Sequence, residues 1–319
     1  MVRLASCSPI ALAAVLAFGV LPSAAMAADP ETAAPADSTR PIPVLDNDVA
    51  DDAAAQDDTT PAKADSSTGE WQPLDFSQFG QELTSRWIPV PNGSSGAPRQ
   101  GWLATADGFF TREAHLAYDY VDSDGTDAEE VLARIHYPWS RRFWTGLQIP
   151  FYQRLGNRAE FGDITLTTQV MLHESRNVSI NAGVGWQLPT GSSRIGGGVF
   201  AAQPQVNFWS DVGSGFSIRG RLGYEFANRG GADSFVLNAA IGQTITKHDR
   251  TPFGDLTWYA AVNWREFTQG GVSSFVSITP GMRTHLTGNL FLLAGVEFPV
   301  TSTANSFNRR YIVQIVKGF

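Results

Sequence analysis

Between residues 110 and 319, apolar side chains recur at every second position, and this alternation sets the strongest limit on the fold. A period of two is that of a β-strand with one apolar and one polar face, because successive side chains point to opposite sides. The apolar faces span residues 114–120, 131–139, 147–151, 164–172, 178–188, 200–208, 216–226, 235–241, 256–264, 276–282, 290–298 and 311–319. The pattern predicts an all-β fold.

The strand lengths indicate a membrane barrel. Each segment is close to the roughly 9–11 residues with which a tilted strand crosses a bilayer, and beyond residue 27 no run approaches the roughly 18 apolar residues of a spanning helix. An even strand count returns both chain ends to one side. We therefore expect a transmembrane antiparallel up-and-down β-barrel of about 12 strands over residues 109–319, with short turns after the even-numbered strands.

Outward aromatic residues fall into two bands when each is placed by strand direction. The outer band contains Tyr118, Tyr120, Trp186, Tyr224, Phe226, Trp264, Phe298 and Tyr311, and the inner band contains Phe110, Tyr137, Trp139, Phe208, Phe216, Trp258 and Phe319. Two such bands are typical of the two interfaces of a membrane barrel, whereas a sandwich core needs its bulk in the middle. The predicted location is the outer membrane of a Gram-negative bacterium, in contact with its lipid.

The final strand ends on Phe319, after apolar residues at Tyr311, Val313 and Ile315. A terminal strand of this kind resembles the closing strand of bacterial outer-membrane barrels, whose end is read by the assembly machinery. We expect that machinery to recognise Phe319. The alternative is the last edge strand of a soluble sandwich.

The N-terminal region has two parts that do not belong to the barrel. Residues 1–27 combine a positive charge, an apolar run and small residues before a cleavage site, which predicts a secretory signal peptide. It contains Cys7, the chain's one cysteine, so the exported protein has no disulfide or thiolate metal site. Residues 28–70 are rich in Ala, Asp and Pro and carry eleven acidic residues against Arg40 and Lys63. We expect this acidic segment to be disordered, either as a spacer or as a binding segment for basic partners or cations.

Residues 71–108 are expected to contain one short helix and a loop. Phe76, Phe79, Leu83 and Trp87 are spaced three, four and four apart, so a helix over 75–87 would carry them on one face. Such a helix could plug the lumen from the periplasmic side or lie on the membrane surface. Pro and Gly residues after it predict a loop.

The inward face of the predicted barrel is polar. Its charged residues are Glu113, Arg134, Asp163, Arg219, Arg221, Glu225, Arg265 and Glu297. These charges of both signs would line a hydrated solute path whose transverse field orients a passing molecule. The alternative is that they pair with one another and fill a narrow interior. Tyr152, Trp209 and Tyr259 are also expected to point inward, where they would form an aromatic track or, near the strand ends, only cap the lumen.

The sequence gives little support for an enzymatic function or a bound cofactor. His173 and Ser175 resemble the His-x-Ser element of outer-membrane lipid-modifying enzymes, but they fall in a periplasmic turn, away from the outer leaflet. The other histidines, His115, His136, His248 and His285, lack metal-ligand spacing. No phosphate loop, dinucleotide fingerprint or basic stripe is present. We expect no catalytic residues, no metal, no cofactor and no nucleic-acid partner.

Several short motifs resemble a known family. Phe161–Ile164 opens one strand, Leu188–Gly191 and the Gly-rich 196–198 follow the next, and Gly223–Tyr224 fits the same pattern. Over roughly residues 110–319 the chain resembles the outer-membrane family named for the meta-pathway of phenol degradation. The resemblance implies an outer-membrane channel or transporter, often for aromatic or other hydrophobic compounds.

The sequence therefore predicts an outer-membrane channel for the passive passage of small solutes, aromatic or hydrophobic compounds among them. Two alternatives remain open. One is a closed structural barrel whose acidic segment tethers periplasmic partners, and the other is a lipid-modifying enzyme. An open barrel conducts ions and a closed one does not.

Overall fold

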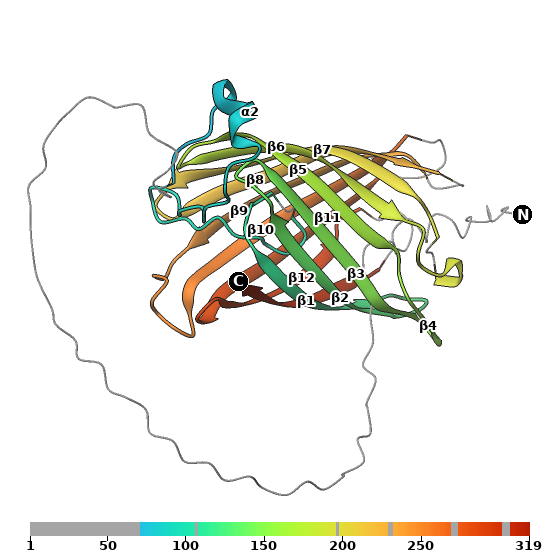
Figure 1. Ribbon diagram of the computed structural model, residues 1–319. Coiled ribbons are helices and arrows are strands. Elements are labelled where there is room, and N and C mark those ends of the chain that lie inside the picture. Colours follow the sequence, from blue (N-terminus) through green and yellow to red (C-terminus); the bar gives the residue numbers. More distant parts are fainter. Residues whose placement is uncertain (1–70, 106–107, 196–197, 229–231, 269–273, 302–306) are drawn as a thin grey trace, which may run out of the picture. The chain divides into compact units, whose positions relative to one another are not determined.

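The barrel closes through β2–β3, the pairing that joins the two ends of one continuous antiparallel sheet. The structure is a computed structural model that describes residues 71–105, 108–195, 198–228, 232–268, 274–301 and 307–319. The strands are β1 (Glu113–Asp122), β2 (Ala128–Pro138), β3 (Phe143–Leu155), β4 (Arg158–Glu160), β5 (Ile164–Glu174), β6 (Val178–Leu188), β7 (Ala201–Gly213), β8 (Phe216–Ala227), β9 (Ser234–Thr244), β10 (Gly254–Phe267), β11 (Phe275–Thr287), β12 (Leu290–Pro299) and β13 (Arg309–Gly318). The three-residue strand β4 pairs only with the end of β3, as a short hairpin. Twelve strands therefore form the wall, as predicted (Figure 1).

Turn lengths distinguish the two rims. Four of the turns after β2, β5, β7, β9 and β11 contain two to four residues, and the turn after β9 contains nine. We call this end the short-turn rim and the other the long-loop rim. The turn after β7 consists of Ser214 and Gly215, both with positive φ, at 54° and 75°. Two positive φ values match the right-handed twist of a hairpin, and Gly215 adopts the second without strain.

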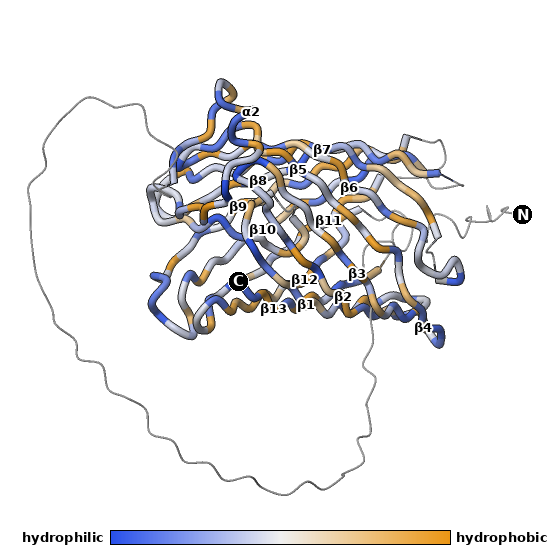
Figure 2. The backbone as a smooth tube through the Cα atoms, in the orientation of Figure 1, coloured by the Kyte–Doolittle hydropathy of each residue, from blue (hydrophilic) through white to orange (hydrophobic). Residues whose placement is uncertain are grey.

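The outer wall carries the predicted apolar residues (Figure 2). Leu116, Ile135, Leu222 and Ile241 are each about half exposed or more, at 50%, 48%, 59% and 51%. Soluble monomers rarely expose apolar patches of more than a few hundred Å², so a surface of this kind requires lipid. Trp139 and Trp258 of the inner aromatic band also face outward. Among the described residues, no helix is long and apolar enough to cross a membrane.

Two residues expected on the other face are corrected. Phe110 was expected in the inner aromatic band, but β1 begins only at Glu113 and Phe110 turns into the lumen, where it is 2% exposed. Tyr152 was expected to face inward, but it pairs with outward Val131. A bulge at Phe151 adds one residue to β3 and reverses the side of every residue beyond it.

The helix expected over 75–87 is also shorter than predicted. A 3-10 turn, η1 (Phe76–Gln78), leads into α2 (Phe79–Glu82), and the chain is extended by Arg86, which forms an isolated bridge with Ser140. The Asp75 carboxylate caps η1 by accepting from the Ser77 amide at 2.6 Å, and the hydrogen bonds from Ser77 lower the pKa of Asp75. A second 3-10 turn, η2 (Ser193–Ile195), lies in the loop after β6. The expected signal peptide and acidic segment lie outside the described residues.

Candidate functional site

A cavity of about 300 Å³ lies inside the barrel. Its wall comes from the middle of the strands and from their long-loop ends, and its floor is formed by residues 102–105. Its charged lining consists of Asp119, Glu130, Arg134, Arg221, Glu225, Arg265, Glu297 and Arg310. Among the described residues, four arginines thus face four carboxylates, and their formal charges sum to zero. A polar wall of this kind holds water and small solutes rather than lipid tails.

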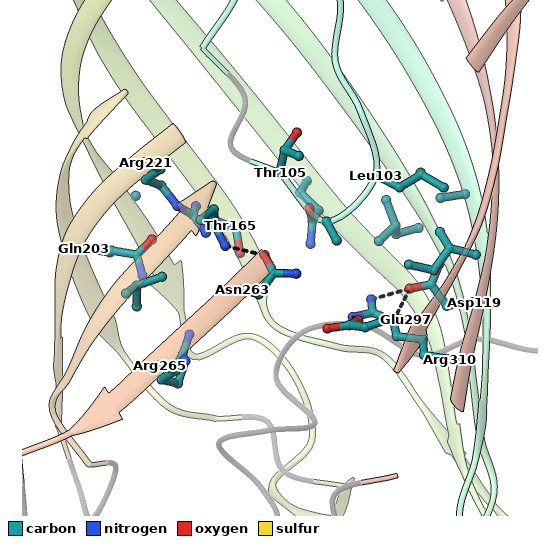
Figure 3. Close-up of a pocket in the computed structure, with 18 of the residues that line it drawn as sticks. Leu103, Thr105, Asp119, Thr165, Gln203, Arg221, Asn263, Arg265, Glu297 and Arg310 are labelled. Atoms are coloured by element: carbon teal, nitrogen blue, oxygen red, sulfur yellow. Dashed lines mark hydrogen bonds and ion pairs between the residues drawn. The ribbon is translucent and has the colours of Figure 1, made fainter. Parts of the chain in front are cut away.

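One side of the cavity is organised by Arg310 (Figure 3). Its Nε donates to Asp119 Oδ2 at 2.9 Å, and its Nη1 lies 3.4 Å from Glu297 Oε2. These three residues come from β13, β1 and β12, which are neighbours in the sheet. Charge-assisted bonds between neighbouring strands fix the rotamers of the three side chains. Two carboxylates share one arginine, which leaves this side net negative.

The opposite side carries more positive charge (Figure 3). Arg265 Nη1 donates to Glu225 Oε1 at 2.7 Å, and Arg221 Nη1 donates to the neutral Gln205 at 3.3 Å. Two arginines therefore accompany one carboxylate there. On β2 and β3, Arg134 donates to Gln148 at 2.6 and 3.1 Å. The described lining thus has opposite net charge on its two sides, while its arginines pair with wall residues, as in the alternative interpretation. The transverse field on a passing solute stays a prediction.

Below the cavity, the lumen is occupied by residues 97–105 and 108–110, which we call the lumenal segment. The Trp102 ring stacks on Tyr259 with centroids 4.9 Å apart, and the Arg219 guanidinium lies 3.7 Å from the Trp102 centroid. The Leu103 amide donates to the Tyr259 hydroxyl at 2.9 Å. Room for the ring comes from Gly242, where an added Cβ would lie 2.6 Å from Trp102. The floor of the cavity is therefore a packed contact.

The lumenal segment is anchored at the short-turn rim. Arg99 Nη1 donates to Glu174 Oε1 at 2.8 Å, and both side chains are almost fully buried. Glu174 also accepts from Trp71 Nε1 at 3.2 Å and lies 3.6 Å from Arg141. Nearer the rim, the Ser95 amide donates to Asp211 at 2.8 Å. These contacts hold the entry of the segment against the wall.

Five of the eight predicted lumen charges line the cavity, namely Arg134, Arg221, Glu225, Arg265 and Glu297. Arg219 and Glu113 lie in the half of the barrel next to the short-turn rim. There Arg219 packs on Trp102, and Glu113 lies 3.6 Å from Arg283. Prediction missed Arg310, because it precedes the apolar alternation that begins at Tyr311. It also left Asp119 and Glu130 out of the solute path, although both share the inward face of their strands.

Asp163, the eighth predicted charge, organises the long-loop rim. Its carboxylate accepts from the amides of Gly191 at 2.6 Å and Gly198 at 2.9 Å. Gly198 has a φ of +84°, and an added Cβ on Gly191 would lie 2.6 Å from the Gly162 backbone. Both positions therefore require glycine. Three of the four motifs that carry the family resemblance thus meet at one carboxylate.

The residues expected to plug the lumen lie at the short-turn rim. Phe76 is 72% exposed and Leu83 is 36% exposed, and α2 sits at the end of the barrel (Figure 1). Arg142 pairs with Glu82 of α2, and Trp87 Nε1 donates to the Phe110 carbonyl at 2.7 Å. Phe79 and Trp87 therefore contact residues at the rim, Phe76 and Leu83 are exposed there, and the lumenal segment fills the lumen in their place.

His173 and Ser175 do not form a catalytic pair. His173 is exposed, on the outward side beside Ile180. The Ser175 hydroxyl accepts from the Val178 amide at 3.1 Å within the turn. Its role there is to close the β5–β6 turn.

Comparison with known proteins agrees with this architecture. No curated protein matches the chain in sequence. An outer-membrane channel from Pseudomonas putida F1 is 13% identical with a TM-score of 0.52, over 70% of this chain and 100% of its own. The KdgM porin is 14% identical with a TM-score of 0.47, over 64% and 99%. The CymD monoaromatic hydrocarbon channel is 7% identical with a TM-score of 0.41, over 66% and 88%.

The likeness to the Pseudomonas channel agrees with the expected fold, a closed antiparallel β-barrel. A family model with the description MetA-pathway of phenol degradation matches residues 92–308, which is more than half of the chain. The match includes most of the barrel and the lumenal segment. The chain therefore belongs to the MetA-pathway of phenol degradation family.

Proposed function

We propose that the protein is a passive channel of the bacterial outer membrane for small solutes. The observation that carries this proposal is the cavity of about 300 Å³, whose four arginines and four carboxylates lie inside a closed barrel. A barrel that served only as a scaffold would have no need of a hydrated cavity with charges on opposing sides. Passage by diffusion requires no cofactor, and that expectation, like the expectation of no enzymatic activity, stays a prediction.

The solute class we propose is small molecules with an aromatic or other apolar part. The family description names phenol degradation, and the cavity lining combines charged groups with Trp102, Leu103, Leu132 and Ile312. A phenolic solute presents an apolar ring and a hydroxyl, which these two kinds of surface match. Recognition of Phe319 by the assembly machinery also stays a prediction.

In this proposal the lumenal segment is the gate. The cavity ends at residues 102–105, and the inner half of the barrel is filled by buried side chains that include Trp144, Trp209 and Arg283. A solute therefore crosses only when the segment moves. The same packing favours the second candidate, a permanently closed structural barrel.

The two candidates separate in a planar bilayer. We would measure single-channel conductance of the folded full chain, of Trp102→Ala and of Trp258→Ala. Trp258 neighbours Tyr259 on β10 but faces outward, so its variant is a matched control. A channel predicts openings that become more frequent in Trp102→Ala alone and are blocked by phenol. If none of the three folded proteins conducts ions, the channel proposal is wrong and the structural barrel takes its place.

A further inference from the structure

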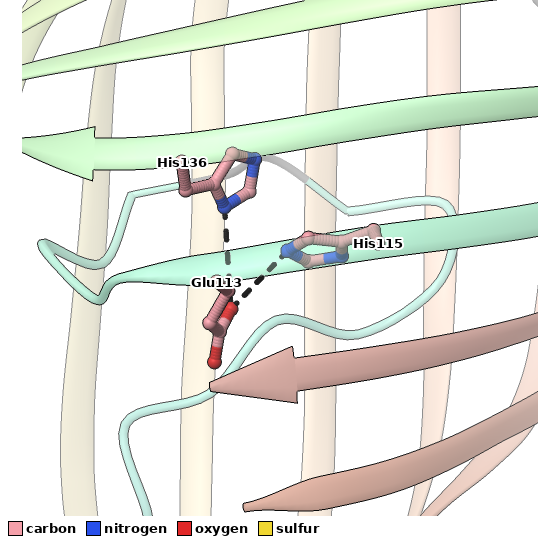
Figure 4. Close-up of side chains that lie close together, drawn as sticks. All are labelled: Glu113, His115 and His136. Atoms are coloured by element: carbon pink, nitrogen blue, oxygen red, sulfur yellow. Dashed lines mark ion pairs between the residues drawn. The ribbon is translucent and has the colours of Figure 1, made fainter. Parts of the chain in front are cut away.

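Glu113, His115 and His136 form a compact triangle on the inner wall of the barrel (Figure 4). Glu113 and His115 are two residues apart on β1, so both point inward. His136 on β2 pairs directly with Glu113. Cross-strand partners and i, i+2 neighbours stand close on one face of a sheet. The hairpin register therefore creates a cluster that no local spacing in the sequence reveals.

The ligand atoms of these residues converge. Glu113 Oε2 lies 3.3 Å from His115 Nε2 and 4.0 Å from His136 Nδ1, and all three atoms lie within 4.8 Å of one another. The three residues are 7%, 4% and 3% exposed. Ligands at about 2.0–2.1 Å around a tetrahedral metal stand about 3.3–3.5 Å apart. The edge between Glu113 Oε2 and His115 Nε2 already has this length. Side-chain movements of under about 1 Å would bring the other ligand atoms to the same spacing.

The surroundings fix the ligands in place. The other ring nitrogen of His115, Nδ1, lies 2.7 Å from the Gln314 amide. Rotating that amide by 180° presents its oxygen to Nδ1–H and leaves Nε2 as a lone-pair donor. The other oxygen of Glu113 faces Arg283 at 3.6 Å, and the His136 ring packs against Trp144 at 4.9 Å. His115 and Glu113 thus each have a polar outer partner of the kind found at metal sites, and ring packing orients His136.

Within the triangle, the contact between His115 Nε2 and Glu113 Oε2 is polar but loose. The two atoms lie 3.3 Å apart, without the alignment of a full hydrogen bond, although both side chains are buried. The two imidazole rings lie 4.4 Å apart. A metal ion uses both as neutral ligands.

We propose that Glu113, His115 and His136 bind one divalent transition-metal ion of the zinc class, with water in the remaining position. Two imidazoles and one carboxylate are a donor set that zinc prefers. Because the ligands come from β1 and β2, and Gln314 comes from β13, the ion ties together three adjacent strands. The site lies outside the cavity lining, and its proposed role does not depend on solute passage.

Metal content tests the site directly. Because the ligands are buried, we would refold the full chain in detergent with Zn²⁺ or with EDTA, remove free ions and measure bound zinc. The expected result is about one ion per barrel in the wild type and in the control His173→Ala, whose histidine is exposed. Glu113→Gln and His115→Ala should lose the ion, and Gln314→Leu should bind about 10–100-fold more weakly.

A folded wild type without zinc would overturn the proposal. Equal zinc in a folded His115→Ala, His136→Ala double variant would do the same. Heat-modifiable migration on a gel reports folding of each variant. If the variants do not fold, the wild type refolded with Co²⁺ alone decides the matter. A four- or five-coordinate visible spectrum supports the site, and the spectrum of hydrated Co²⁺ overturns it.

Discussion

Arg310 is the residue on which the electrostatics of the cavity depend most. It bridges Asp119 and Glu297, so one cation neutralises one of two carboxylates contributed by neighbouring strands. The residues of β13 that line the cavity are Arg310, Ile312 and Gln314. The sequence contains this alternation, but apolar periodicity indicates only the outward face. Charged partners across strands become visible only when the register is known.

Arg310→Gln should make the channel more cation-selective. The change removes one positive charge from the cavity wall and leaves Asp119 and Glu297 in place. One unit charge at about 4 Å in a hydrated path is worth about 1 kcal/mol, or about fivefold in local ion concentration. The reversal potential in a KCl gradient measures this shift. Arg194→Gln is the control, since Arg194 is 73% exposed in a loop pair with Glu160.

Gly242→Ala should weaken the closed gate without deleting any polar contact. The new methyl group would meet the Trp102 ring at 2.6 Å, and overpacking of this kind costs about 1–3 kcal/mol. Opening frequency should rise about five- to a hundredfold if the strain is released by movement of Trp102. Gly185→Ala is the control, since its nearest neighbour lies at 3.8 Å. Equal opening of both variants would argue against Trp102 as the gate.

At the scale of the element, strands were predictable and the N-terminal segment was not. Period-two alternation records lipid on one side and the lumen on the other, so it locates each strand of the wall. The helix predicted over 75–87 does not form over its full length, because Leu74 and Arg86 form backbone bridges with Glu174 and Ser140 of the wall. These tertiary bonds outweigh the local preference for a helix. The loop after it, which lacked any pattern, proved to be the lumenal segment.

Glu174→Ala should release the lumenal segment while the wall remains folded. The variant leaves Arg99 buried without its carboxylate, which costs about 3–5 kcal/mol. Arg99 is 6% exposed in the wild type, so trypsin should not cut after it. In the variant, cleavage after Arg99 should appear although the barrel still migrates as a folded band. Glu160→Ala is the control, and protection of Arg99 in both variants would contradict this anchor.

At the scale of the whole molecule, closure explains why a chain without disulfides forms this structure. Every wall strand is paired on both sides, so no edge is left to meet lipid with unsatisfied backbone groups. Strand number, topology and five cavity charges followed from the sequence alone. The bulge at Phe151 and the inward turn of Phe110 did not, since both depend on packing inside the finished barrel.

The wild-type channel should discriminate little between cations and anions. The described lining of its cavity carries equal numbers of arginines and carboxylates, so the formal charge of this lining is zero although the two sides differ. The reversal potential in a KCl gradient should lie near zero and should depend little on salt, because a neutral path has no net charge to screen. A strongly selective wild type would show that a path other than this cavity carries the current.

The lumenal segment also bears on how the barrel can open. Ser95 contacts Asp211 at the short-turn rim before the segment enters, and the Arg112 carbonyl accepts from the Phe319 amide at the same rim after it leaves. Entry and exit therefore share one mouth. A loop whose two ends lie at the same rim can leave the lumen through that rim, and no free chain end has to pass through the pore. The barrel can open and reclose without unthreading.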